Sequence, residues 1–132
     1  MEIIEMEDKM LIGIAITGDS LDSPVDPRFG RANAFAIVET DSDELKSVIK
    51  NPNVSSGGGA GISTAQLLAN EGIKAIIAGA IGPNAFGVLK SAKIDIYSSS
   101  GVSSAREALE KFKAGKLTKS TNATTMPHNR RI

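Results

Sequence analysis

The chain has 132 residues, which fits a single domain, since domains commonly hold about 100–150 residues. Its 15 lysines and arginines balance 15 aspartates and glutamates, and a neutral chain argues against a protein that holds nucleic acid through phosphate contacts. The absence of cysteine excludes disulfides, thiol nucleophiles and cysteine-ligated metal clusters. The first nine residues are acidic and lack a long apolar run, so we expect neither a signal peptide nor a membrane span, and a cytoplasmic protein.

The first half of the chain has the pattern of a three-stranded meander that follows an N-terminal extension, residues 1–9. The run 10–16 is almost entirely apolar and has the length of a strand, which is typical of a strand buried on both faces of a sheet. After a loop with two prolines, 34–38 forms a second apolar run, and 45–49 alternates apolar and polar residues as an edge strand does. No helical pattern separates these segments, so we expect loops between them.

The second half alternates helical and strand patterns. Apolar residues that recur every three or four positions indicate helices, and the short apolar runs between them indicate buried strands. The expected elements are a helix at 62–71, a strand at 75–78, a helix at 83–92, a strand at 94–97, and a helix that starts near 102 and ends at Gly115.

This order, βββαβαβα, predicts an α/β fold. The right-handed crossover rule favours a five-stranded mixed sheet in the order 3-2-1-4-5, with strand two antiparallel and three helices on the two faces, as in ribonuclease-H-like folds. We expect one domain over residues 10–117. Residues 118–132 show no periodicity, so we expect them to form a disordered tail.

In that topology the loops richest in glycine and serine meet at one edge of the sheet. The carboxyl ends of strands one, three, four and five share this edge, where ligands of open α/β sheets bind. The loops are 17–31, 51–61, 79–84 and 98–101. Their convergence predicts a binding site.

Two features of these loops favour an anion. Residues 57–61, Gly-Gly-Gly-Ala-Gly, open the first helix, and the N–H groups at a helix start lack helical partners and carry partial positive charge. Arg28 and Arg31 lie in another loop of the same edge, and guanidinium groups suit carboxylates and phosphates. The alternative for the glycines is a tight turn that only starts the helix.

Asp19, Asp22 and Asp26 have two possible roles. They can pair with the arginines, or they can be metal ligands of a nuclease; the second role needs carboxylates from several elements, whereas these three share one loop. Ser103 and Ser104 lack the nucleophile elbow and the core histidine that a serine nucleophile needs. We therefore assign no catalytic residue and expect a protein that is not an enzyme.

Two segments together resemble a known family. Residues 25–32 read Val-Asp-Pro-Arg-Phe-Gly-Arg-Ala, and residues 81–86 read Ile-Gly-Pro-Asn-Ala-Phe. With the glycine loop, they make residues 10–117 similar to the dinitrogenase iron–molybdenum cofactor biosynthesis family. The resemblance implies a non-catalytic ribonuclease-H-like domain that binds or carries iron–sulfur or iron–molybdenum cofactor precursors between assembly proteins.

Carried over by motif, the resemblance implies cofactor contacts on three loops. These contacts are Arg28, Phe29, Gly30, Arg31, Gly57, Gly58, Gly59, Gly61, Gly82, Pro83 and Asn84. No metal ligand is assigned, because cysteine is absent and the one histidine, His128, lies in the polar tail. A cluster bound transiently is then expected to be held through its bridging ligands, an organic acid on it, or its charge.

Three functions stay open on this evidence. The first is a carrier of an anionic metallocluster, the second a regulatory domain that binds a phosphorylated metabolite or nucleotide, and the third a bare interaction module. The first two require the same anion-binding edge. We expect metallocluster assembly proteins as partners, no nucleic acid or membrane, and a monomer or weak homo-oligomer.

Overall fold

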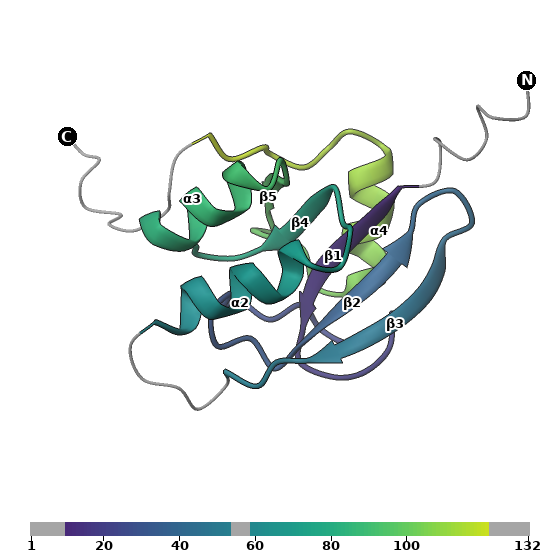
Figure 1. Cartoon of the computed structure of the whole chain (residues 1–132). Coiled ribbons are helices and arrows are strands. Elements are labelled where there is room, and N and C mark those ends of the chain that lie inside the picture. The colour runs from purple at the N-terminus through teal and green to yellow at the C-terminus, as the bar shows by residue number, and fades with distance from the viewer. Residues whose placement is uncertain (1–9, 54–58, 122–132) are drawn as a thin grey trace, which may run out of the picture.

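The computed structural model describes residues 10–53 and 59–121 (Figure 1). The expected N-terminal extension and most of the expected tail, including His128, lie outside these ranges. The elements are β1 (Leu11–Ile16), β2 (Ala34–Glu39), β3 (Glu44–Lys50), α2 (Ala60–Ala69), β4 (Ala75–Ala78), α3 (Pro83–Ser91), β5 (Asp95–Ser98) and α4 (Ala105–Lys113).

The strands form one five-stranded sheet in the order β3-β2-β1-β4-β5. β2 runs antiparallel to both β1 and β3, while β4 is parallel to β1 and to β5. The predicted α/β class, strand order, antiparallel second strand and three helices are confirmed for the described residues.

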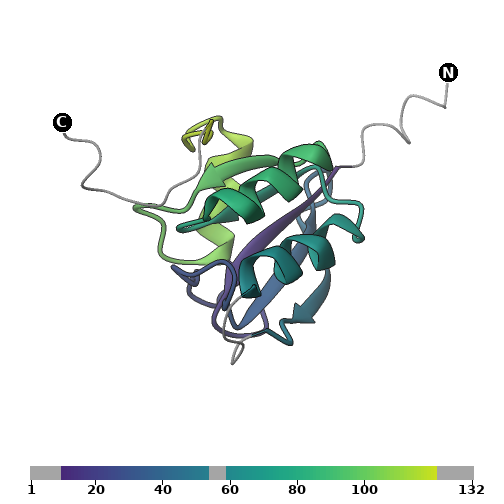
Figure 2. The same ribbon diagram turned by 60° about the vertical axis from the view of Figure 1, so that its left-hand side comes forward.

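Helices cover both faces of the sheet, which explains why β1 is apolar throughout. α2 and α3 lie side by side on one face and α4 lies on the other (Figures 1 and 2). Ile12, Ile14 and Ile16 pack in the core beneath α4, whereas Ala15 packs in the core beneath α2 and α3. This arrangement places the starts of α2 and α3 at the carboxyl edge of the sheet, next to the loop that follows β1.

Two helices start at positions that differ from those expected. α2 begins at Ala60, two residues before the expected position 62, because Gly59 adopts a left-handed conformation with φ of 81° that lets the chain turn into the helix there. α4 begins at Ala105 rather than near 102. Ser104 is its N-cap and accepts a hydrogen bond from the backbone N of Glu107 at 3.2 Å.

The folded domain extends past the boundary expected at residue 117. The backbone N of Ser98 donates to the carbonyl of Thr118 at 2.9 Å, and the backbone N of Ser120 donates to the carbonyl of Ile96 at 2.7 Å. Lys119 also pairs with Asp95 at 3.3 Å. The expected disorder from residue 118 is therefore wrong for 118–120, which lie along the outer edge of β5. The two hydrogen bonds join backbone atoms, so they do not require a periodic pattern of side chains that could be recognised in the sequence.

Candidate functional site

A groove of about 440 Å³ opens at the carboxyl edge of the sheet, between the loop after β1 and the start of α2. We call it the arginine groove. Its lining residues are Pro27, Arg28, Phe29, Gly30, Arg31, Gly59, Ala60, Gly61 and Ala80. The structure thus brings together most of the predicted contacts of the first two loops, while Gly57 and Gly58 lie outside the described residues.

The floor of the groove is a close contact between two glycines. A Cβ atom on Gly30 would lie 2.9 Å from the backbone N of Gly61 and 3.0 Å from its Cα. Among the described residues, no side chain caps the start of α2, and its first turn holds no acidic residue. The first N–H groups of α2 therefore remain suited to an anion above them.

Gly82, Pro83 and Asn84 border this region but do not line the groove. Gly82 is the N-cap of α3 and Pro83 its first residue, and all three are exposed. A Cβ on Gly61 would lie 3.4 Å from the Cβ of Ala85, so the first turns of α2 and α3 are in contact. The third predicted loop thus adjoins the other two at the same edge.

Arg28 is held by an aspartate of its own loop. Its Nε donates to Oδ1 of Asp26 at 3.0 Å, and its Nη2 donates to Oδ2 at 2.9 Å. The alternative in which an aspartate pairs with an arginine is therefore observed for Arg28. Since 55% of the Arg28 side chain stays exposed, the ion pair fixes the guanidinium at the rim without removing it from solvent.

The carboxylate of Asp26 is the anchor of this loop. Its side chain is 0% exposed, and it also accepts hydrogen bonds from the backbone N of Arg28 at 3.0 Å and of Asn33 at 2.9 Å. Burial acts to raise the pKa of Asp26, but the hydrogen bonds from Arg28 and Asn33 outweigh it and lower that pKa below its ordinary value. Asp26 is therefore ionised inside the fold and holds both ends of the turn 26–33.

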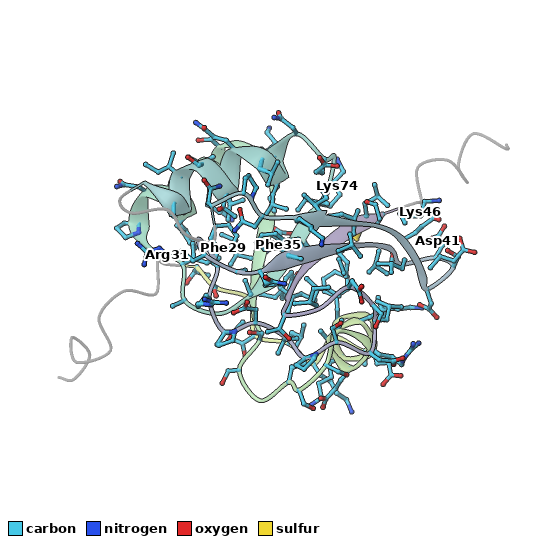
Figure 3. The ribbon with its side chains drawn as sticks, turned by 90° about the horizontal axis from the view of Figure 1, so that it is seen from below. Phe29, Arg31, Phe35, Asp41, Lys46 and Lys74 are labelled. Carbon is cyan, nitrogen blue, oxygen red and sulfur yellow. The ribbon has the colours of Figure 1, made fainter. Side chains whose placement is uncertain are left out.

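Phe29 and Arg31 face in different directions. Phe29 is 2% exposed, and its ring packs edge-on against Phe35 with centroids 5.8 Å apart. Arg31 is exposed and lies at the periphery, while Phe29 and Phe35 lie further inside (Figure 3). Phe29 therefore secures the loop, and Arg31 presents a cationic side chain to the groove.

A buried polar network holds the loop to α2, and it was not predicted from the sequence. Oγ1 of Thr64 donates to the carbonyl of Gly30 at 2.8 Å. Nδ2 of Asn51 donates to the same carbonyl at 3.0 Å and to that of Ala32 at 2.9 Å. Asn51 follows β3 and Thr64 lies in α2, so the network joins three segments that are far apart in the sequence.

We expect Thr64→Val to lower the free energy of unfolding by about 1–2 kcal/mol, because a buried hydrogen bond is lost at nearly constant volume. Urea denaturation measures the change. Ser63→Ala is the control, since Ser63 is an exposed neighbour in the same helix and its substitution should change stability by less than about 0.5 kcal/mol. Equal stability of the Thr64 variant and the wild type would show that the network does not secure the loop.

Three of the residues that were considered for catalysis make other contacts in the structure. Oδ1 of Asp22 accepts a hydrogen bond from Arg106 at 3.0 Å, and Asp26 is buried against Arg28. The hydroxyl of Ser103 donates to Glu107 at 2.8 Å at the start of α4. Within residues 10–53 and 59–121, no three carboxylate, histidine or cysteine side chains gather in a way that could hold a metal ion.

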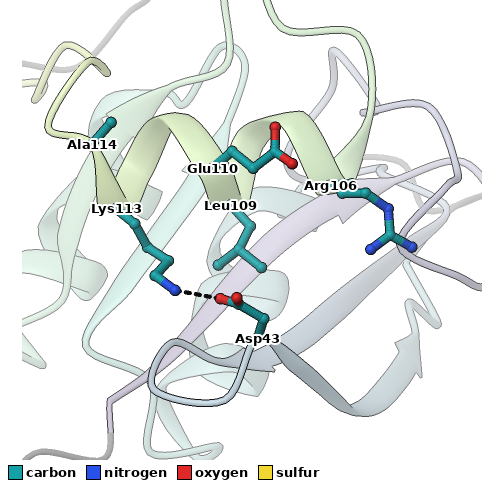
Figure 4. A pocket seen from close by; sticks show the side chains of 6 residues that line it. All are labelled: Asp43, Arg106, Leu109, Glu110, Lys113 and Ala114. Carbon is teal, nitrogen blue, oxygen red and sulfur yellow. Dashed lines mark hydrogen bonds and ion pairs between the residues drawn. The ribbon is translucent and has the colours of Figure 1, made fainter.

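A separate hollow of about 420 Å³ lies between α4 and the β2–β3 turn, away from the predicted loops (Figure 4). Asp43 and Lys113 form an ion pair there, and Arg106 is paired with Asp22. Its charges are balanced, so it does not favour an anion. None of the helices in the described part of the chain is long and apolar enough to cross a membrane.

Known proteins share both the sequence and the geometry of this domain. Residues 10–115 match the family model described as dinitrogenase iron-molybdenum cofactor. The uncharacterized protein MJ0580 of Methanocaldococcus jannaschii is 38% identical over 111 residues, which cover 83% of this chain and 92% of the relative. The apo form of the orange protein from Desulfovibrio gigas superimposes with a TM-score of 0.82 at 30% identity, over 89% of this chain and 97% of that structure. Because the match to the family model spans the whole sheet, all three helices and the arginine groove, the chain belongs to the dinitrogenase iron-molybdenum cofactor family.

Proposed function

We propose that this protein is a non-catalytic carrier of an anionic metallocluster, such as an iron–sulfur or iron–molybdenum cofactor precursor, and that the cargo binds in the arginine groove. The observation that carries the proposal is the meeting of Arg28, Arg31 and the start of α2 around one groove. Membership of the family supports a cluster as the anion. The partners of such a carrier are the proteins that assemble the cluster and receive it.

The donor set suits an anion better than a bare metal ion. The chain contains no cysteine, and the described residues contain no histidine, so neither thiolate nor imidazole is available at the groove. Guanidinium and backbone N–H groups donate hydrogen bonds to negatively charged sulfur or oxygen. The cargo is thus held by its charge and its outer atoms, which is compatible with release to a partner.

Arg31→Ala is the sharpest test of this proposal. Arg28 is unsuitable because its removal also breaks the ion pair with the buried Asp26. We expect Arg31→Ala to weaken binding of a preformed iron–sulfide cluster by about ten- to hundredfold, the range for loss of a charged hydrogen bond. Anaerobic titration followed by visible absorption measures the affinity, with phosphate and a nucleotide as parallel probes.

Lys74→Ala is the matched control, because it removes the same charge from an exposed residue just before β4, at the opposite edge of the sheet from the groove (Figure 3). It should leave cluster affinity unchanged. Equal affinity of the Arg31 variant and the wild type would contradict the proposed site. Tight binding of the nucleotide with no affinity for the cluster would contradict the carrier role and favour a regulatory domain.

A further inference from the structure

A second hollow, of about 490 Å³, lies beside the arginine groove at the ends of β4 and β5. We call it the serine hollow. Its lining residues are Val25, Pro27, Gly79, Ala80, Ser98, Ser99, Ser100, Gly101, Val102 and Ser120. Pro27 and Ala80 line both hollows, so the two are neighbours along one continuous edge.

The chemistry of the serine hollow differs from that of the arginine groove. None of the residues that line it carries a charge, and four of them are serines. A phosphate or a comparable anion is normally held by arginine or lysine, which this hollow lacks. Hydroxyl groups can both donate and accept hydrogen bonds, so the hollow suits an uncharged group with hydroxyl or carbonyl oxygens.

Ser99 is the residue that marks this hollow as a binding site. It is 7% exposed, and its backbone N donates to the carbonyl of Ala78 at 3.0 Å while its carbonyl accepts from the backbone N of Val102 at 3.0 Å. Its hydroxyl forms no hydrogen bond with any other residue that the structure describes. Because buried polar groups are nearly always paired, a hydroxyl left without a protein partner on the wall of a hollow is suited to a ligand.

We infer that the two hollows form one bipartite site, whose ligand has an anionic end and an uncharged organic end that bears hydroxyl or carbonyl oxygens. The anionic end lies in the arginine groove, and the organic end hydrogen-bonds to Ser99. This inference rests on the proposed function for the anionic end. The organic end can come from a free phosphorylated sugar or from an uncharged, hydroxyl-bearing ligand attached to a metallocluster.

Ser99→Ala tests the inference with two pairs of probes. The first pair is inorganic phosphate and ribose 5-phosphate, and the second is an iron–sulfide cluster with ethanethiolate ligands and the same cluster with 2-hydroxyethanethiolate ligands. We expect the variant to weaken binding of the hydroxyl-bearing member of one pair by about three- to tenfold, as the loss of one neutral hydrogen bond does, and to leave binding of the other member unchanged. The pair that responds identifies the source of the organic end.

Thermal melting distinguishes a ligand-binding role of the Ser99 hydroxyl from a structural role. Since the hydroxyl has no protein partner in the described part of the fold, Ser99→Ala should melt at the same temperature as the wild type or higher. Ser91→Ala, at the exposed end of α3, is the control and should change neither melting nor binding. A lower melting temperature together with equal weakening of all four probes would overturn the inference.

The measurements with Arg31→Ala and Ser99→Ala also distinguish a failure of this inference from a failure of the proposed function. If Arg31→Ala weakens all four probes and Ser99→Ala weakens none selectively, the bipartite site is wrong and the carrier proposal stands. If Ser99→Ala is selective while Arg31→Ala has no effect, the arginine groove is wrong as the anion site. A wild-type protein that binds neither hydroxyl-bearing probe more tightly than the other member of its pair also overturns the inference.

Discussion

Gly79→Ala is expected to lower the free energy of unfolding by about 3 kcal/mol, and to abolish ligand binding at the carboxyl edge. A Cβ atom on Gly79 would lie 1.9 Å from the carbonyl oxygen of Pro27 and 2.7 Å from its carbonyl carbon. Backbone atoms cannot give way as the tip of a side chain can, so the loop after β1 must move. That loop carries Arg28, Phe29 and Arg31, and Pro27 lines both hollows.

The measurement is urea denaturation together with titration of the variant by the cluster. Gly87→Ala is the control, because Gly87 lies in α3 with nothing within 4 Å of its added Cβ. Alanine favours a helix over glycine, so this control should be as stable as the wild type or more stable by up to about 1 kcal/mol. A Gly79 variant that unfolds at the wild-type urea concentration and still binds the cluster would show that the close approach of Pro27 is not required.

The sheet could be predicted from the sequence because its signals are local. Each strand is a short apolar run closed by glycine, proline or polar residues, and the helices repeat their apolar positions every three or four residues. The crossover rule then restricts the strand order to few solutions. The same reasoning predicted that Arg28, Arg31 and the glycine loop lie at one edge of the sheet, because that prediction needs only the directions of the strands.

The residues that hold the site together could not be predicted in this way. Thr64 donates to Gly30, which is 34 positions away, and Gly79 lies against Pro27, more than 50 positions away. The segment 118–120 pairs with β5 through backbone atoms, which any sequence possesses. Such contacts depend on which loops lie next to each other in the fold, and neither the spacing of apolar residues nor the charge of the chain predicts this.

Asp26 is an example of a residue whose role could not be predicted from the sequence. Its substitution is the second change for which we expect a large loss of stability. From the sequence it was one of three loop aspartates that could pair with arginine, with nothing to distinguish it. In the structure it accepts four hydrogen bonds through a carboxylate that is 0% exposed. Asp26→Asn replaces one carboxylate oxygen by an amide NH2 group that cannot accept a hydrogen bond. Two donors then lose their acceptor: the backbone N and Nε of Arg28 if Oδ1 is replaced, or Nη2 of Arg28 and the backbone N of Asn33 if Oδ2 is replaced. We expect this to lower the free energy of unfolding at pH 7 by about 2–4 kcal/mol.

The pH dependence of the stability difference between wild type and Asp26→Asn tests whether the ionised carboxylate is its cause. Hydrogen bonds hold the pKa of folded Asp26 below its ordinary value of 3.8, despite the opposing effect of burial. The stability that the ionised carboxylate contributes is therefore complete above the pKa of the unfolded chain, near 3.8, and is lost as pH falls through the lower folded pKa. Urea denaturation should give the same difference in the free energy of unfolding between wild type and Asp26→Asn at pH 7 and pH 5, and a smaller difference at pH 3.

Asp22→Asn is the control, since the side chain of Asp22 is 78% exposed and pairs with Arg106 at the surface. This substitution should lower the free energy of unfolding by less than about 1 kcal/mol. A difference for Asp26→Asn that does not shrink at pH 3 would mean that the ionised carboxylate is not what holds the arginine loop in place.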